Sequence, residues 1–241
     1  MWPVLAAVGV IVLLVALGMR QQYALIGFGL SAMVAAGIFI EWWRGTSSRH
    51  RSSGENYLLA FLRLISANRP RYGGYIVHLA VVMVVLGVLG GSFFDIQRDV
   101  ILKPGESFAI KNYEIRYIST SEAFESDRTE FVSTVEVFRD GQYLETLTPK
   151  RTFYPSFNMA ATLAAIRSTP VEDFYVVPSE NLPGGAVGFR ILINPLVWWM
   201  WVAGPVLILG AVVSLWPQKV RDRAGAPSPV RVPARSRVST A

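Results

Sequence analysis

The stretch that decides the fold is RPRYGGYIVHLAVVMVVLGVLGGSFF, from Arg69 to Phe94. From Gly74 onward this stretch contains no charged residue, and its 21 remaining residues are as long as the roughly 20 that cross about 30 Å of hydrocarbon. A single histidine, His78, interrupts the apolar run. An ionisable residue inside a membrane span is by default a functional hypothesis. The stretch therefore predicts a transmembrane helix over 74–94 and a candidate site within it.

Three other stretches are similarly apolar, at 2–19, 23–42 and 195–216, and the chain as a whole is 52% apolar, which is too high for an ordinary soluble domain. We therefore expect an α-helical integral membrane protein with four transmembrane helices. The alternative for 2–19 is a cleaved signal peptide. No basic residue precedes this stretch and no small-residue cleavage pattern follows it, so a span is favoured.

Basic residues set the expected orientation, because lysine and arginine near a span resist translocation. Six lie in the predicted loop over 44–73 and six more in the tail over 217–241. Both termini are expected in the cytoplasm of a bacterial inner-membrane protein. The loop contains an amphipathic helix over 55–67 that either lies on the membrane surface or packs against a neighbouring helix. The tail lacks apolar residues for a core and is predicted to be disordered.

Between residues 95 and 194 the apolar runs give way to alternation, as in YEIRYIS (Tyr113–Ser119) and FVSTVEVF (Phe131–Phe138). Period-two alternation between turn residues is typical of β-strands that are buried on one face. Seven to nine short strands fit this segment. We expect an extracytoplasmic all-β domain, built as a sandwich or a barrel.

The absence of certain residues excludes several functions. The chain has no cysteine, which excludes covalent heme attachment through C-x-x-C-H, disulfides and thiol exchange. It contains neither a P-loop nor a G-x-S-x-G motif, so neither an ATPase nor an α/β-hydrolase is supported. The net charge of +6 arises from the basic loop and tail that set the topology, and no nucleic-acid partner is expected.

His78 has two interpretations. Gly74, one turn before it, leaves space beside the ring, so a flat macrocycle can lie there with imidazole as axial ligand, and Arg71 is then a possible contact for a heme propionate. Lys150, Arg151 and Tyr154 in PKRTFYP form a second polar cluster that could meet heme propionates, although the residues favour an ordinary exposed strand edge over this contact. Alternatively, His78 hydrogen-bonds a neighbouring helix, an interaction worth about 0.6 kcal/mol on average.

The segment NRPRYGGYIVHLAVVMVVLG (Asn68–Gly87) resembles the signature span of the C-terminal part of the CcmF cytochrome c-type biogenesis family, which reads approximately N-R-R-R-Y-G-G-Y-x-V-H-x-G. The resemblance implies that His78 is an axial ligand of an intrinsic heme b in a heme lyase. It also implies that the chaperone CcmE delivers heme and that a CcmH-type protein presents apocytochrome c for thioether formation outside the membrane. Further segments resemble the family in the same order: LKPGESFAIKNYEIRY (Leu102–Tyr117), PKRTFYPS (Pro149–Ser156), EDFYVV (Glu172–Val177) and INPLVWWMWVAG (Ile193–Gly204).

The chain also departs from the family pattern. It has no Trp-rich WWD segment and no histidine over 95–194, and its other histidine, His50, lies in a polar stretch. These features predict the C-terminal half of a divided heme lyase, or a shortened form. The N-terminal half, with the WWD segment, would then supply the second axial ligand, and the chain alone would have no lyase activity. The alternatives are a membrane-anchored scaffold whose β-domain recruits apocytochrome or maturation proteins, and a transporter fragment, for which only Gly204 and Pro205 give a hint.

Overall fold

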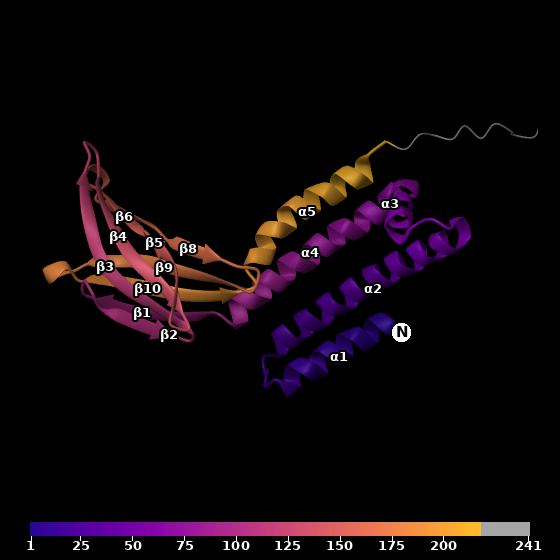
Figure 1. The fold of residues 1–241 in the computed structure, drawn as a ribbon, viewed down its shortest axis with the longest axis horizontal. Helices are drawn as coiled ribbons and strands as arrows, with labels where there is room; N and C mark the ends of the chain where they lie inside the picture. The colour runs from indigo at the N-terminus through magenta and orange to yellow at the C-terminus, as the bar shows by residue number, and fades with distance from the viewer. Residues whose placement is uncertain (218–241) are drawn as a thin grey trace, which may run out of the picture.

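The computed structural model describes residues 1–217 and consists of a helical part and a β-domain at its end (Figure 1). The β-domain is inserted between the fourth and fifth helices. The predicted disordered tail lies outside the described residues apart from its first residue, Pro217. The helices are α1 (Trp2–Ala16), α2 (Gln22–Ser53), α3 (Tyr57–Ala67), α4 (Arg69–Phe93) and α5 (Trp198–Leu215).

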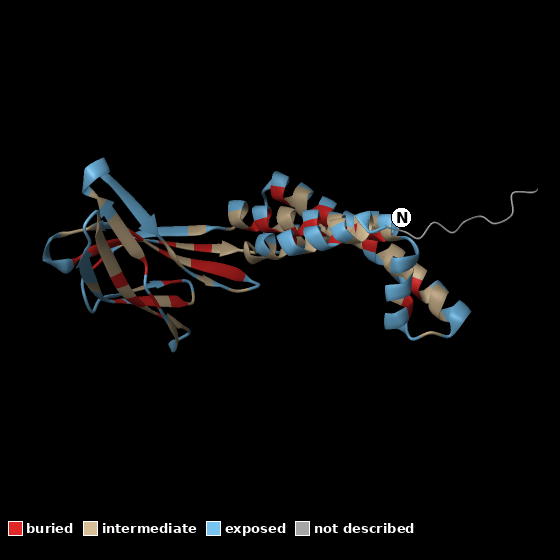
Figure 2. Cartoon of the chain, turned by 90° about the horizontal axis from the view of Figure 1, so that it is seen from above, coloured by how far each residue is buried: buried red, intermediate tan, exposed pale blue. Residues whose placement is uncertain are grey.

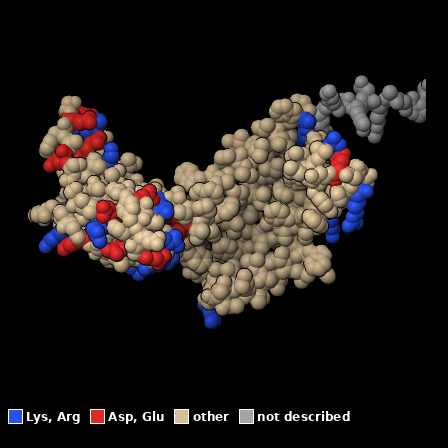
Figure 3. Space-filling model, viewed as in Figure 1, with Lys and Arg blue, Asp and Glu red and all other residues tan. Residues whose placement is uncertain are grey.

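Three helices, α2, α4 and α5, are long and apolar enough to cross a membrane. Their flanks show no charged groups in the space-filling view, where arginines gather at the end away from the β-domain (Figure 3). The prediction of a fourth span over 2–19 is not confirmed, because α1 has only 15 residues. At 1.5 Å per residue α1 is about 22 Å long, shorter than the hydrocarbon layer. The chain turns away at Gly18, whose φ of +93° suits glycine.

The predicted loop over 44–73 is instead mostly helical. The α2 helix continues past Trp42 to Ser53 and ends only at Gly54, which adopts the left-handed conformation with φ of 67°. The amphipathic segment forms α3, which starts after Asn56 caps it, the Oδ1 accepting from the Leu58 N–H at 3.3 Å. Asn68 then caps α4, which starts at Arg69. Charged residues mark where a helix leaves the membrane, but they do not end it.

The β-domain is a two-sheet antiparallel sandwich, which confirms the predicted β-architecture. It contains ten strands where seven to nine were expected. One sheet has the order β1-β10-β9-β8; the other has the order β2-β3-β4-β6-β7, with β5 also pairing with β4. The strands are β1 (Ile96–Leu102), β2 (Ser107–Ile110), β3 (Tyr113–Phe124), β4 (Thr129–Arg139), β5 (Gln142–Leu147), β6 (Lys150–Tyr154), β7 (Met159–Leu163), β8 (Ala165–Ser168), β9 (Glu172–Asn181) and β10 (Val187–Pro195).

Alternating residues of both sheets form the core of the sandwich. On β3 the side chains of Tyr113, Ile115 and Tyr117 are buried, and they meet Phe174 and Phe189 of the other sheet. The Tyr113 and Phe174 rings stack with centroids 4.6 Å apart. The red residues of Figure 2 follow this alternation along the strands. Such a period-two core is what the sequence alternation predicts.

The β-domain is joined to helices α4 and α5 by two paired strands. Strand β1 follows α4 and strand β10 leads into α5, and the two strands pair from Ile96 opposite Ile193 onward. Two hydrogen bonds fasten the junction, from the Leu196 N–H to the Val171 carbonyl and from the Trp199 indole N–H to the Pro170 carbonyl, both at 2.9 Å. The register of β1 and β10 therefore brings α4 and α5 side by side (Figure 1).

Candidate functional site

His78 is exposed on the flank of α4, with its ring held by the helix backbone. Its Nδ1 lies 2.8 Å from the Gly74 carbonyl oxygen. A carbonyl can only accept a hydrogen bond, so Nδ1 carries the proton and Nε2 of the neutral ring keeps its lone pair. Histidines that bind metals are commonly oriented by such a bond from the other ring nitrogen. The ring therefore has the tautomer that a metal ligand needs.

The glycine pair before His78 serves two different faces of α4. A Cβ atom added to Gly73 would lie 2.5 Å from the backbone nitrogen of Ser214 on α5, so Gly73 permits close helix contact. Gly210 on α5 does the same from the other side, since its Cβ would lie 2.7 Å from the Val77 nitrogen. A Cβ atom on Gly74, in contrast, would meet nothing within 4 Å. Gly74 therefore leaves open space one turn from the His78 ring.

The exposed surface beside His78 differs in part from the expected one. By helical spacing, four aliphatic residues share the face of His78 and are expected to form a surface beside it: Val81, Val82, Val85 and Leu89. Val82 and Leu89 are buried, and Leu89 packs on Gly27 of α2. Val81, one turn after His78, is exposed. Residues three and four positions apart all lie near the face of His78, so spacing alone cannot separate exposed residues from buried ones. The position of α2 against α4 decides which of them are buried.

Arg71 lies two turns before His78, about 10.5 Å along the helix axis, and it already has partners. Its Nη2 donates to Glu41 Oε2 of α2 at 2.6 Å, and its Nε donates to the Tyr75 hydroxyl at 3.0 Å. Sequence reasoning missed both partners. A signal for Glu41 existed, because it is the first acidic residue of the chain and lies at the end of an apolar stretch. The pair holds α2 and α4 in register beside the candidate site.

His50 does not lie near His78. Its Nδ1 is 2.5 Å from the Glu55 carbonyl oxygen, and its ring stacks on Tyr57 at 4.0 Å. The Arg71–Glu41 contact places these two residues at the same level along the antiparallel helices α2 and α4. From that level, His50 lies nine residues along α2 and His78 lies seven residues along α4 in the opposite direction. At 1.5 Å per residue, the two histidines are therefore about 24 Å apart along the helix axes. No other histidine occurs in the sequence. His50 therefore cannot share a metal ion with His78.

Lys150, Arg151 and Tyr154 do not form one cluster. They lie on β6, where neighbouring side chains point to opposite faces, so Arg151 faces away from Lys150 and Tyr154. Arg151 lines a small cavity with Glu122, Phe131 and Asn181, among others. His78 is about 22 Å from the end of α4 that meets the β-domain. The three residues are therefore separated from His78 by the second half of α4, and they cannot contact a group bound at His78.

The β-domain also buries an acidic pair, Glu172 and Asp173. Glu172 Oε1 accepts from the Tyr113 hydroxyl at 3.0 Å, and Asp173 Oδ1 accepts from the Ser168 hydroxyl at 2.6 Å. Burial, together with the neighbouring Glu172, raises the pKa of Tyr113 above its usual value. These bonds account for both carboxylates, and residues 1–217 contain no group of three or more His, Asp or Glu side chains suited to a metal ion. We assign the pair a structural role.

Comparison with known proteins identifies the β-domain. Residues 93–195 match the family described as the CcmF C-terminal beta-sandwich. The β-domain is therefore similar to the C-terminal β-sandwich of CcmF. This finding confirms the resemblance of the chain to the C-terminal part of CcmF.

Curated relatives extend the similarity into the helices. The chain is 27% identical over 161 residues to the cytochrome c-type biogenesis protein CcmF of Haemophilus influenzae, covering 67% of this chain and 25% of the relative. It is 28% identical to Escherichia coli CcmF, covering 63% and 24%, and 29% identical to the Rhodobacter capsulatus biogenesis protein ccl1, covering 86% and 30%. The chain therefore spans about a quarter of the length of the CcmF relatives.

A solved structure has the same fold. The structure titled cytochrome c heme lyase CcmF matches with a TM-score of 0.69 and 23% identity, covering 89% of this chain and 34% of that one. The sandwich family covers only residues 93–195, whereas the structural match covers 89% of the chain. The structural match therefore includes helices as well as the sandwich. The arrangement of CcmF-like helices and β-sandwich is thus shared.

Proposed function

We propose that this CcmF-like chain is a membrane subunit of a cytochrome c heme lyase, in which His78 is one axial ligand of an intrinsic heme b. The observation that supports the proposal is the exposed His78 ring, with Nδ1 bound to the Gly74 carbonyl and Nε2 left for a metal. Open space at Gly74 accommodates a flat group next to the ring. When bound, the heme would supply the one-electron chemistry that keeps a delivered heme reduced.

The other residues of the site have positioning tasks. The Gly74 carbonyl holds the imidazole in one tautomer. Arg71, fixed by Glu41 and Tyr75, places a guanidinium on the same flank, where it can bind a propionate. Because His50 is too distant, the second axial ligand is assigned to the N-terminal part of the lyase, supplied by a partner polypeptide with a Trp-rich segment.

The assembled complex would attach heme to the thiols of apocytochrome c outside the bacterial inner membrane, with CcmE delivering heme and a CcmH-type protein presenting the thiols. The orientation is supported by the arginines at the end of the helices away from the β-domain (Figure 3). The β-sandwich would then lie on the extracytoplasmic side. On that side, a delivered heme could contact Lys150 and Tyr154 on one face of β6, or Arg151 on the other face.

The test is a reduced-minus-oxidised spectrum of the chain purified together with its membrane partners. We expect b-type bands in the wild type, their loss in His78→Ala and their retention in the matched control His50→Ala. His78→Met, which keeps a possible iron ligand, should retain heme at a shifted potential. Wild-type bands at an unchanged potential in both His78 variants would refute the ligand role.

A scaffold is the second candidate, supported by exposed apolar residues at the tip of the β-domain. Phe124 and Phe157 are 77% and 78% exposed, and they lie at the turns that join β3 to β4 and β6 to β7. Clustered exposed apolar groups often mark a binding surface for another protein. A pure scaffold would keep cytochrome maturation in His78→Ala cells and lose it when Phe124 and Phe157 are changed to serine. The lyase proposal expects loss of maturation in the His78 variant.

A further inference from the structure

Two adjoining grooves lie at the end of α2 away from the β-domain, the first between α2 and α3 and the second along α2 alone. The first, here called the apolar groove, has a volume of about 520 Å³ and is lined mainly by the aromatic side chains of Phe39, Trp42, Trp43, Tyr57 and Phe61. The second, here called the polar groove, has a volume of about 450 Å³ and is lined by Trp43, Arg44, Ser47, Ser48, Arg51 and Ser52. Trp43 forms a wall of both.

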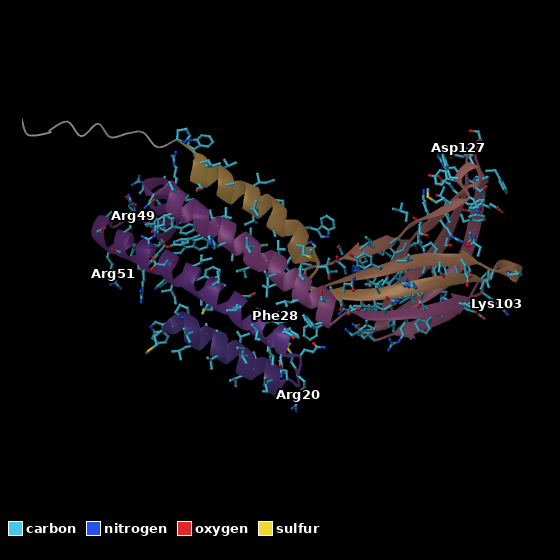
Figure 4. The ribbon with its side chains drawn as sticks, turned by 180° about the vertical axis from the view of Figure 1, so that it is seen from behind. Arg20, Phe28, Arg49, Arg51, Lys103 and Asp127 are labelled. Atoms are coloured by element: carbon cyan, nitrogen blue, oxygen red, sulfur yellow. The ribbon has the colours of Figure 1, made fainter. Side chains whose placement is uncertain are left out.

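The polar groove carries two arginines without a carboxylate partner. Arg49 and Arg63 both pair with Glu55, but Arg44 and Arg51 make no ion pair within residues 1–217. Arg44 and Arg51 are both exposed and lie seven residues apart, which places them on the same face of α2, about 10.5 Å apart along its axis. Figure 4 shows Arg51 at the end of α2. Guanidinium groups in this arrangement suit an anion such as phosphate.

Unpaired polar atoms occur at both grooves. The Trp42 indole nitrogen, at the apolar groove, and the Ser47 hydroxyl, at the polar groove, are buried and have no hydrogen-bond partner among the described residues. Leaving such groups unpaired costs free energy, so buried polar atoms generally have a partner. An amphiphile with ester and phosphate oxygens next to apolar chains can supply partners to both after small side-chain rotations.

The position along α2 fits the membrane interface. The helix has 32 residues and is about 48 Å long, which exceeds the roughly 30 Å of hydrocarbon. Its last turns therefore reach the headgroup layer, and Trp42 and Trp43 lie where tryptophan is enriched. The apolar groove then opens toward the acyl chains, and the polar groove lies level with the lipid phosphates.

We propose that the two grooves form one site for an anionic phospholipid. An acyl chain occupies the apolar groove against Trp42 and Phe61, and the phosphate binds between Arg44 and Arg51. A bound lipid would link α3 to α2 at the base of the helical part. Charge complementarity favours this occupant over a helix of a partner protein, which would have to carry an acidic group to the same place.

The test uses the absence of cysteine, because Leu58→Cys gives the full chain a single thiol in the apolar groove. The thiol is labelled with bimane, and the chain is placed in nanodiscs of phosphatidylcholine. Brominated phosphatidylglycerol or brominated phosphatidylcholine is then added at the same fraction, and quenching is compared. Since each arginine near an anionic headgroup contributes roughly a five-fold preference, we expect the anionic lipid to quench at about five- to 25-fold lower fraction.

Two further double variants, made in the Leu58→Cys chain, test whether Arg44 and Arg51 cause the preference for the anionic lipid. Arg44→Gln with Arg51→Gln should bring the preference close to one. The control Arg20→Gln with Arg98→Gln removes the same charge from residues outside the grooves and should leave the preference intact. Three results would overturn the proposal: equal quenching by both lipids, quenching by neither because protein covers the groove, or a preference that responds alike in both double variants.

Discussion

The contact between α4 and α5 depends on Gly73, where a larger side chain would clash with α5. The neighbouring Gly74 has room for a larger side chain. In Gly73→Ala, the new methyl group would lie 2.5 Å from the Ser214 nitrogen and 2.7 Å from its Cα. Ordinary contact begins near 3.4 Å, so the α5 backbone must move by about 0.9 Å. The obstacle is backbone and has no rotamer to adopt. Overpacking of this kind typically costs about 1–3 kcal/mol.

Gly74→Ala is the matched control, because its methyl group meets nothing within 4 Å. We expect it to match the wild type, or to exceed it by up to about 1 kcal/mol through higher helix propensity. The assay is reversible unfolding of the full chain by sodium dodecyl sulfate, followed by fluorescence of the tryptophans at the start of α5. Gly210→Ala should cost a similar amount, and the Gly73/Gly210 double variant should cost less than the sum, since the helices have already separated. Equal stability of Gly73→Ala and Gly74→Ala would refute this account of the glycine pair.

Two predictions concern polar groups away from the membrane. Asp173→Ala should destabilise the β-domain by about 1–3 kcal/mol, because the fully buried Asp173 carboxylate accepts hydrogen bonds from the Ser168 and Tyr175 hydroxyls, and these are lost with it; a thermal midpoint equal to that of the wild type would contradict this. Burial would raise the pKa of Glu55, but the hydrogen bonds from Arg63 and Arg49 outweigh it and hold that pKa below its usual value. The contribution of Glu55 to α3 docking is therefore present above the unfolded-state pKa near 4.5 and is lost as the pH falls through the lower folded-state pKa. Hydrogen exchange of α3 should accelerate there in the wild type, and this pH dependence should be absent in Glu55→Gln.

The sequence by itself determined the local features of this protein. Apolar runs predicted the helices around residues 23–42, 74–94 and 195–216, because a lipid environment needs about 20 apolar residues in a row. Alternation in the segment from Tyr113 to Phe138 predicted strands, because only one face of each strand meets the core. The CcmF resemblance and the choice of His78 as candidate ligand also came from local motifs.

The tertiary structure alone decided how surfaces are shared between elements. Helical spacing places Val81 and Val82 equally one turn from His78, but the packing of the neighbouring helices leaves Val81 exposed and buries Val82. Gly73 faces α5, whereas Gly74 faces open space. Because the two residues are identical, the sequence does not show this difference. Glu41 pairs with Arg71 across 30 positions of chain. Lys150 and Arg151 are neighbours in sequence but face opposite sides of a strand. In each case local periodicity describes one element, whereas the contact depends on where a distant element packs.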